Sequence, residues 1–253
     1  MEILLTNDDG YRSPGLAALV EIVKPYGHVT VVAPEDMQSG MSSALTTKIP
    51  VRLRKITSGE GVDIYACSGT PVDCVKLAMS CILPQKPGLL ASGINHGINA
   101  SSAVIYSGTL GAAAEGALYG LPSIGFSLAD DAPDADFSGC KAFAGKIIDR
   151  ALAQPVAPNV FLNVNFPALP PDRIKGIRLA RQHKGAWYEE FEKRTDPRGD
   201  DYYWLTGQFI NHEPGAPDAD ENLVRAGYIA IVPHRIDMTD YAELKRLRAE
   251  WRL

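Results

Sequence analysis

Short apolar runs alternate with amphipathic helical patterns through the first half of the chain, and this alternation limits the possible folds more than any other feature. Segments with the length and composition of buried strands occur at 3–6, 28–33, 89–92, 123–127 and 161–165. Strands separated by helical patterns are typical of parallel βαβ units. The pattern predicts an α/β fold in three layers, with helices on both faces of an open, mostly parallel sheet. In such sheets ligands bind at the carboxyl ends of the strands.

Helix start signals support this pattern. Pro14 stands just inside the start of a predicted helix over 13–24, and Thr70 and Pro71 provide a cap and a first helical residue for a second one. Both segments continue with apolar residues spaced to form one face. A third helix, rich in small residues, is predicted over 108–118.

The second half of the chain has a different character. Proline and charge increase after a predicted strand at 161–165, so we place a soft boundary near Pro170. Residues 1–170 are expected to form the core, and 171–253 a C-terminal extension of the same compact unit. Segments 174–180, 202–204 and 228–232 are predicted as strands of hairpins or of an extended arm, and 240–253 as a charged closing helix.

Composition restricts the class of protein. Apolar residues make up 45% and charged residues 22% of the 253 residues, as in globular proteins. The net charge of −5 does not favour an obligatory nucleic-acid partner, whereas a small anionic substrate is compatible if a cation is bound.

The cysteines and the apolar runs predict a location. The four cysteines contain no C-x-x-C pair and are expected to be buried thiols, which suits a reducing compartment. No signal peptide and no run of about 18 apolar residues is found, so we expect a cytoplasmic protein without a membrane partner.

The strongest local signal is Asn7-Asp8-Asp9-Gly10, directly after the first predicted strand. Adjacent carboxylates repel each other, and facing a cleft they require a cation or hydrogen-bond donors. A surface turn uses the same residue types, and these four residues alone leave the two interpretations equally open.

Three further polar segments follow. Residues 38–43 contain Ser39, Gly40 and Ser42, which could complete an oxygen ligand shell or form a linker. Residues 92–99 include Asn95, whose amide oxygen suits Mg²⁺ or Mn²⁺; we leave His96 out of the metal ligands because a lone loop histidine is more often structural.

Residues 106–111 contain Ser107, Gly108 and Thr109 at the start of the predicted 108–118 helix. A helix N-terminus with hydroxyl groups can bind an anion, although this segment taken alone favours an ordinary Ser or Thr cap on a tightly packed helix. All four segments are expected at the carboxyl ends of strands, and together they predict a metal site for phosphoryl transfer. Motifs of dinucleotide-binding folds, P-loops, zincins and α/β-hydrolases are absent from the sequence.

An ordered set of motifs resembles the survival protein SurE family, a group of metal-dependent 5′-nucleotidases and phosphatases. The resemblance covers nearly the whole chain and is carried by Leu-Thr-Asn-Asp-Asp-Gly at 5–10, Ala-Pro at 33–34, Gln-Ser-Gly-Met-Ser at 38–42, Gly-Thr-Pro-Val-Asp-Cys-Val at 69–75, Ser-Gly-Ile-Asn-His-Gly-Ile-Asn at 92–99, Tyr-Ser-Gly-Thr-Leu-Gly-Ala-Ala at 106–113, Asp-Pro-Arg-Gly at 196–199, Tyr-Tyr-Trp at 202–204 and Gly-Tyr at 227–228.

The resemblance implies that one Mg²⁺ or Mn²⁺ per subunit is held by Asp8, Asp9, Ser39 and Asn95, with Ser107, Gly108 and Thr109 near the phosphate. It also implies a Rossmann-like core and a protruding C-terminal arm used for homodimers or homotetramers. Our candidates for further phosphate or substrate contacts are Asn7, Gly40, Ser42 and Asn99.

The expected activity is metal-dependent hydrolysis of nucleoside 5′-monophosphates, with Asp8 and Asp9 as catalytic residues. The alternatives are a catalytically inactive nucleotide- or metal-sensing protein, and an oligomeric scaffold. The sequence leaves open the preferred nucleotide, action on 3′-nucleotides or polyphosphate, the metal used in the cell, attack by water or by Asp8, and the choice between dimer and tetramer.

Overall fold

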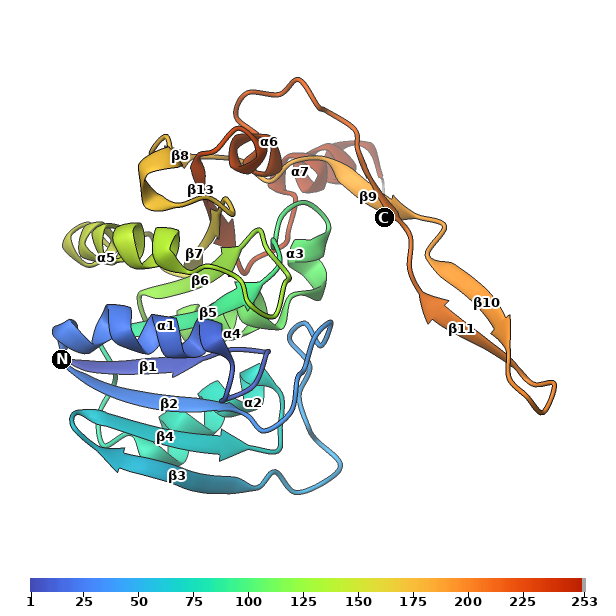
Figure 1. Ribbon diagram of the computed structural model, residues 1–253. Coiled ribbons are helices and arrows are strands. Elements are labelled where there is room, and N and C mark those ends of the chain that lie inside the picture. Colours follow the sequence, from blue (N-terminus) through green and yellow to red (C-terminus); the bar gives the residue numbers. More distant parts are fainter. Residues whose placement is uncertain (252–253) are drawn as a thin grey trace.

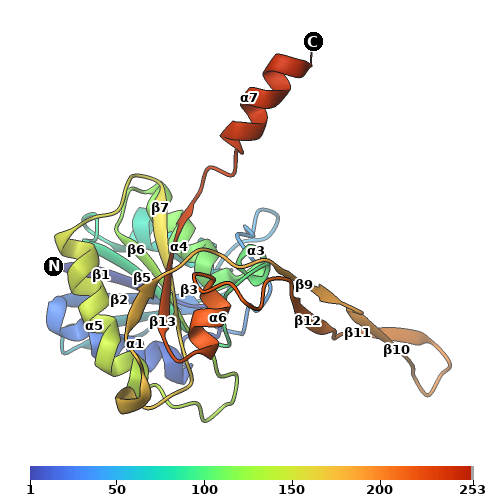
Figure 2. The same ribbon diagram turned by 90° about the horizontal axis from the view of Figure 1, so that it is seen from above.

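The computed structural model describes residues 1–251 and contains a nine-stranded sheet with helices on both faces (Figures 1 and 2). The strand order is β3-β4-β2-β1-β5-β6-β7-β13-β8. The strands from β4 to β7 are mutually parallel, while β3 and β13 pair antiparallel with β4 and β7. The predicted three-layer α/β fold with a mostly parallel sheet is confirmed.

The elements of the sheet and its covering helices are β1 (Glu2–Thr6), α1 (Pro14–Val23), η1 (Lys24–Tyr26), β2 (His28–Pro34), β3 (Leu53–Gly59), β4 (Val62–Cys67), α2 (Pro71–Leu77), η2 (Ala78–Ile82), β5 (Leu89–His96), α3 (Ala103–Tyr106), α4 (Gly108–Leu118), β6 (Ser123–Leu128), α5 (Ser138–Ala153), β7 (Val160–Phe166), η3 (Pro171–Arg173), β8 (Ile177–Leu179), α6 (Asp220–Arg225) and β13 (Ile229–Arg235).

Side chains alternate between the two faces of β1. Ile3 and Leu5 join the core beneath α1 and α5, whereas Leu4 joins the core beneath α2 and α4. Because both faces are covered by helices, the strand is apolar throughout and not alternating.

The predicted helix starts are confirmed. The Ser13 side chain accepts a hydrogen bond from the backbone N–H of Leu16 at the start of α1. Thr70 and Asp73 form a reciprocal capping box at the start of α2, with Pro71 as the first helical residue. These local contacts satisfy backbone N–H groups that would otherwise have no partner at a helix start.

Strands β3 and β4 and helix α5 are elements that the sequence patterns did not predict. β3 is an edge strand with six of its seven residues exposed, so it lacks an apolar pattern. α5 has no side-chain cap, and glycines interrupt it. Its buried residues Cys140, Ala144, Ile147 and Ile148 nevertheless have helical spacing, which could have identified it.

The placement of two segments in hairpins or an arm and the burial of Cys81 were predicted wrongly, and one predicted strand is longer than expected. Residues 174–180 and 228–232 do not belong to an arm, because β8 and β13 pair with each other and β13 pairs with β7 in the central sheet. The strand predicted at 89–92 continues to His96. Cys67, Cys74 and Cys140 are buried as expected, but Cys81 is exposed because η2 buries only Ala78.

A long two-stranded arm extends away from the body (Figures 1 and 2). Its strands are β9 (Gly185–Tyr188), β10 (Phe191–Thr195), β11 (Asp201–Leu205) and β12 (Gln208–Asn211), with β9 paired to β12 and β10 to β11. The predicted strand at 202–204 lies in this arm.

The closing helix α7 (Tyr241–Glu250) projects from the body in Figure 2 and buries none of its residues. The last two residues of the predicted closing helix, 252 and 253, lie outside the described part. Within residues 1–251, no helix has the length and apolar character needed to cross a membrane.

Candidate active site

Asp8 and Asp9 follow β1 at its carboxyl end. Asp8 is buried and Asp9 is partly exposed. The chain turns sharply at Gly10, whose φ of +97° is favourable only for glycine. Gln38, in the loop after β2, donates its backbone N–H to the Asp8 carbonyl oxygen at 2.7 Å. The loops after two neighbouring strands are therefore joined at the acidic pair.

Asn7 holds this turn in place. Its amide nitrogen donates to the Gly10 carbonyl at 3.0 Å and to Ser13 Oγ at 2.8 Å, which ties the turn to the start of α1. The amide oxygen Oδ1 is buried and has no hydrogen-bond partner among residues 1–251. A buried acceptor without a donor costs free energy, so this oxygen is available to a donor or a cation.

The N-terminus of α4 packs directly against Asp8. The Thr109 hydroxyl donates to Asp8 Oδ1 at 2.5 Å. A Cβ atom added to Gly108 would lie 2.9 Å from the Asp8 Cβ and 3.0 Å from Oδ2, so only glycine permits this approach. Ser107 accepts from the Leu110 N–H at 3.1 Å and caps the helix. Ser107, Gly108 and Thr109 thus place a helix start beside the carboxylate.

Burial dominates the electrostatics of the pair. Burial raises the pKa of Asp8 from 3.8 to about 6; the Thr109 hydroxyl opposes this change, and the charge of Asp9 adds to it. Burial also raises the pKa of Asp9, while His96 lowers it. Two adjacent acids of raised pKa are characteristic of a functional site more than of a surface turn.

The loop after β2 reaches the start of α4 through Ser42. Its backbone N–H donates to the Tyr106 carbonyl at 3.1 Å, and its hydroxyl donates to the Ile105 carbonyl at 2.6 Å. A Cβ atom on Gly111 would overlap the Ser42 carbonyl oxygen, which shows how closely α4 packs on this loop. Ser39 and Gly40 are exposed on the same loop, next to Gln38.

The segment around Asn95 belongs to β5 and not to a free loop, contrary to the prediction from its composition. The register of the pairing between β5 and β6 shifts between Ser92 and Asn95, which marks an irregularity in the strand just before its end. The backbone N–H of His96 lies 3.4 Å from Asp9 Oδ2. The Asn95 amide nitrogen donates to the carbonyls of His96 and Gly97 at 3.0 and 2.8 Å, which directs the amide oxygen away from these groups.

Asn99 has contacts different from those expected of a substrate ligand. Its side-chain nitrogen donates to Ser127 Oγ at 2.8 Å, and its backbone bonds to the side chains of Asn163 and Asn165. This buried polar network fixes the ends of β5, β6 and β7 to one another. Asn99 therefore anchors the loop, and its contact with substrate stays a prediction.

The structure brings part of the candidate set together and leaves Ser39 and Gly40 exposed on the loop after β2. Asp8, Gly108 and Thr109 are in direct contact, and Asp9 is linked to the Asn95 segment through His96. Two roles were not predicted from the sequence. His96 acts through its backbone N–H, and Thr109 holds Asp8. Neither role could be predicted from a short sequence segment, because His96 is 87 residues from Asp9 and Thr109 is 101 residues from Asp8 in the chain.

The oxygen groups fit a hard divalent cation. Within the described residues, no three His, Cys, Asp or Glu side chains are grouped to hold a metal. The ligands predicted from the sequence, two carboxylates, the Asn95 amide oxygen and the Ser39 hydroxyl, are all oxygen groups, as Mg²⁺ and Mn²⁺ prefer. The unpartnered Asn7 oxygen and the raised pKa of Asp8 both indicate a place where positive charge is required.

Comparisons with known proteins agree with this geometry. The family described as Survival protein SurE matches residues 3–189. A protein of Flavobacterium psychrophilum named 5′-nucleotidase SurE is 48% identical over 97% of this chain and 95% of its own length. A protein of the same name from Phocaeicola vulgatus is 43% identical over 99% of this chain and 96% of its own length.

A solved structure is similar throughout. The crystal structure of the SurE protein from Aquifex aeolicus has a TM-score of 0.85 and 37% sequence identity, and the match covers 99% of both chains. The similarity therefore includes the arm as well as the sheet.

The burial of Asp8 predicts that this residue destabilises the metal-free protein. Its pKa of about 6 exceeds the ordinary 3.8, so the folded state favours the protonated acid. Burial of the protonated Asp8 side chain therefore stabilises the folded protein fully below pH 3.8. This stabilisation is lost as pH rises through about 6, where the buried acid becomes charged. We expect Asp8→Asn to raise the free energy of unfolding by about 1–3 kcal/mol at pH 8 in EDTA, with the gain disappearing near pH 4.

Urea denaturation of both proteins at the two pH values measures this difference. Asp36→Asn, an exposed position on the neighbouring loop, is the matched control and should leave stability nearly unchanged. A loss of stability in Asp8→Asn at pH 8 would contradict the interpretation of Asp8 as a buried charge held for function.

Proposed function

The chain belongs to the survival protein SurE family, and from this membership we propose that it is a 5′-nucleotidase that hydrolyses nucleoside 5′-monophosphates to a nucleoside and phosphate. The observation that carries the proposal is the buried Asp8 carboxylate, held by Thr109 at the N-terminus of α4 and adjacent to Asp9. The alternative of an inactive sensor has no support among the relatives, which are named as nucleotidases.

We propose that Asp8, Asp9, Asn95 and Ser39 would hold one divalent metal ion per subunit, Mg²⁺ or Mn²⁺. When bound, the ion neutralises charge on the phosphate oxygens. Ser39 is exposed on its loop, so its hydroxyl is free to turn toward a ligand. Thr109 orients Asp8 by its hydrogen bond, and the His96 N–H orients Asp9.

The start of α4 is the proposed phosphate site. Backbone N–H groups at a helix N-terminus point along the axis, and the helix dipole favours an anion there. Gly108 has no side chain and so allows the start of α4 to lie against Asp8, which would place a phosphate at the helix start beside this carboxylate. Ser107 supplies a hydroxyl at the same end, and Ser42 joins the loop after β2 to it. Gly40 lies exposed on the same loop and stays a candidate for a phosphate contact.

The activity is tested by phosphate release from a panel of nucleoside 5′-monophosphates. Protein stripped with EDTA should be inactive, and Mg²⁺ or Mn²⁺ should restore turnover. Asp8→Asn removes a ligand charge and should lower kcat by at least about 100-fold. Folded Asp36→Asn protein is the control, and turnover that is independent of metal would contradict the proposed metal site.

Two variants separate the capping and phosphate-binding roles of Ser107. Ser107→Ala removes the cap and should lower the free energy of unfolding by about 1 kcal/mol, whereas Ser107→Gly should lower it by only a few tenths. If the hydroxyl binds phosphate, both variants raise KM for nucleotides. A wild-type KM in Ser107→Gly would show that Ser107 is only a cap.

We also propose that the arm joins copies of this chain into a homodimer or homotetramer. Phe191, Tyr203, Trp204 and Leu205 are all more than half exposed on the arm, and large apolar groups of this kind mark an association surface. Light scattering should give a multiple of 27.3 kDa, and Trp204→Ser should reduce it. A monomer at micromolar concentration would contradict the proposal.

A cytoplasmic location is likewise proposed. It is supported by the free thiols of Cys67, Cys74 and Cys140, since oxidising compartments favour disulfides. Cell fractionation tests it, and recovery outside the cytoplasm would contradict it.

A further inference from the structure

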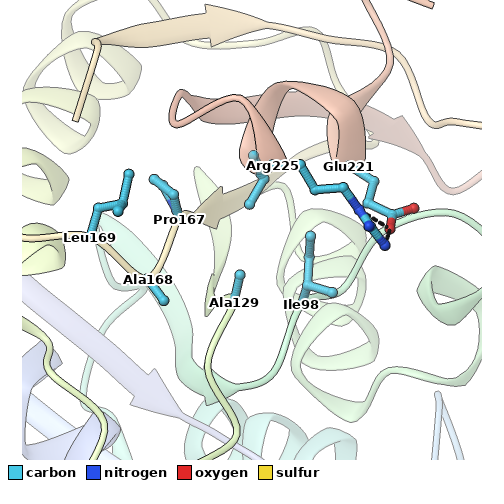
Figure 3. A pocket seen from close by; sticks show the side chains of 8 residues that line it. Ile98, Ala129, Pro167, Ala168, Leu169, Glu221 and Arg225 are labelled. Carbon is cyan, nitrogen blue, oxygen red and sulfur yellow. Dashed lines mark hydrogen bonds and ion pairs between the residues drawn. The ribbon is translucent and has the colours of Figure 1, made fainter. Parts of the chain in front are cut away.

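A cavity of about 360 Å³ lies at the carboxyl ends of β5, β6 and β7 (Figure 3). One wall comes from the loops after these strands and the other from α6. Figure 3 shows the side chains of the two walls facing each other across the cavity. The lining residues are Ile98, Ala129 and 167–169 on the first wall, and Glu221, Val224 and Arg225 on the second.

The cavity lies at the same edge of the sheet as the acidic pair. β1, which carries Asp8 and Asp9, is followed in the sheet by β5, β6 and β7. Adjacent strands lie about 4.8 Å apart, so the end of β6 is roughly 10 Å from the end of β1 within the sheet. The segment from Asn95 to Ile98 borders both places, because Asn95 belongs to the proposed metal ligands and Ile98 lines the cavity.

The walls have the chemistry of a site for a flat, partly polar ring. Ile98, Ala129, Pro167 and Leu169 provide apolar surface, and a volume of this size is typical of small-molecule sites. The single cationic group in the lining is Arg225, at one side of the cavity. Largely apolar walls whose charged groups are one ion pair, Arg225 with Glu221, suit a heterocyclic base better than they suit a sugar or a free anion.

Arg225 is held in a fixed orientation. Its Nε and Nη2 both donate to Glu221 Oε1, at 2.7 and 2.5 Å, while the arginine side chain remains 70% exposed. Glu221 is itself buried, with Oε2 lying 2.9 Å from Nε2 of the buried His183. A planar guanidinium fixed in this way can stack on an aromatic ring with little loss of conformational entropy.

We propose that this cavity binds the base of the nucleotide substrate, with Arg225 stacking on the ring. The inference rests on the proposed function and extends it to substrate choice, since phosphate and base would occupy neighbouring sites along the same edge of the sheet. The base then determines how tightly a nucleotide binds, while the acidic pair acts on its phosphate.

The experiment compares substrates with and without a base. The kcat/KM values for AMP and GMP are divided by the value for ribose 5-phosphate, using full-length protein with Mg²⁺ or Mn²⁺. Ala168→Trp fills the cavity from an exposed position and should lower this ratio roughly ten-fold, the scale of one lost stacked base. Arg225→Lys keeps the charge without the planar group and should lower it several-fold.

Matched variants separate filling of the cavity from a general effect of an added tryptophan. Ala153→Trp places the same side chain at an exposed site at the end of α5 and should leave the ratio unchanged. Tyr106→Ala tests the exposed ring beside Ser107, which is the other surface available for stacking. Adenosine should inhibit the wild type competitively, and its inhibition constant should rise in Ala168→Trp.

These experiments distinguish failure of the proposed base site from failure of the proposed nucleotidase activity. An unchanged ratio in Ala168→Trp, an equal loss on all substrates, or a ratio that falls only in Tyr106→Ala would each overturn the base site. In all three cases phosphate release by the wild type would still support the nucleotidase. Absence of phosphate release from every substrate by folded wild-type protein would instead contradict the nucleotidase and the base site with it.

Discussion

The hydrogen bond from Thr109 to Asp8 joins residues 101 positions apart, and the arrangement of the site depends on it. It brings the N-terminus of α4 against the carboxyl end of β1, and the bare backbone of Gly108 permits the contact. A buried carboxylate alone would be costly, but the hydroxyl and the positive end of the helix dipole partly stabilise its charge. The same approach leaves backbone N–H groups directed at the position proposed for the phosphate.

Those parts of the fold whose signals are local could be predicted from the sequence. Ser13 with Pro14, and Thr70 with Pro71, identify the starts of α1 and α2 because capping involves residues only three positions apart. The edge strand β3 was missed because its exposed residues require no apolar pattern. β8 and β13 were recognised as strands but placed in an arm, because strand periodicity does not indicate the sheet to which a strand belongs.

The candidate site likewise has some features that short sequence segments predict and others that depend on tertiary contacts. Adjacent carboxylates and a hydroxyl-rich helix start can be recognised in short segments, and the structure brings Asp8, Gly108 and Thr109 into contact. The partners of Asn99 could not be predicted, since Asn163 and Asn165 lie more than 60 residues away on β7. A polar residue that anchors a loop has the same composition signal as one that contacts substrate, and only tertiary contacts separate the two roles.

Helix α6 has only six residues and forms one wall of the cavity, yet none of the hydrogen bonds described around Asp8 and Asp9 involves it. The opposite wall is tied to the sheet by the asparagine network around Asn99. Changes at Val224 or Arg225 therefore reshape the cavity while the acidic pair keeps its place. Over evolutionary time, descendants of one ancestral gene can diverge in the molecules they accept through single replacements on this short helix, while the reaction itself is inherited intact.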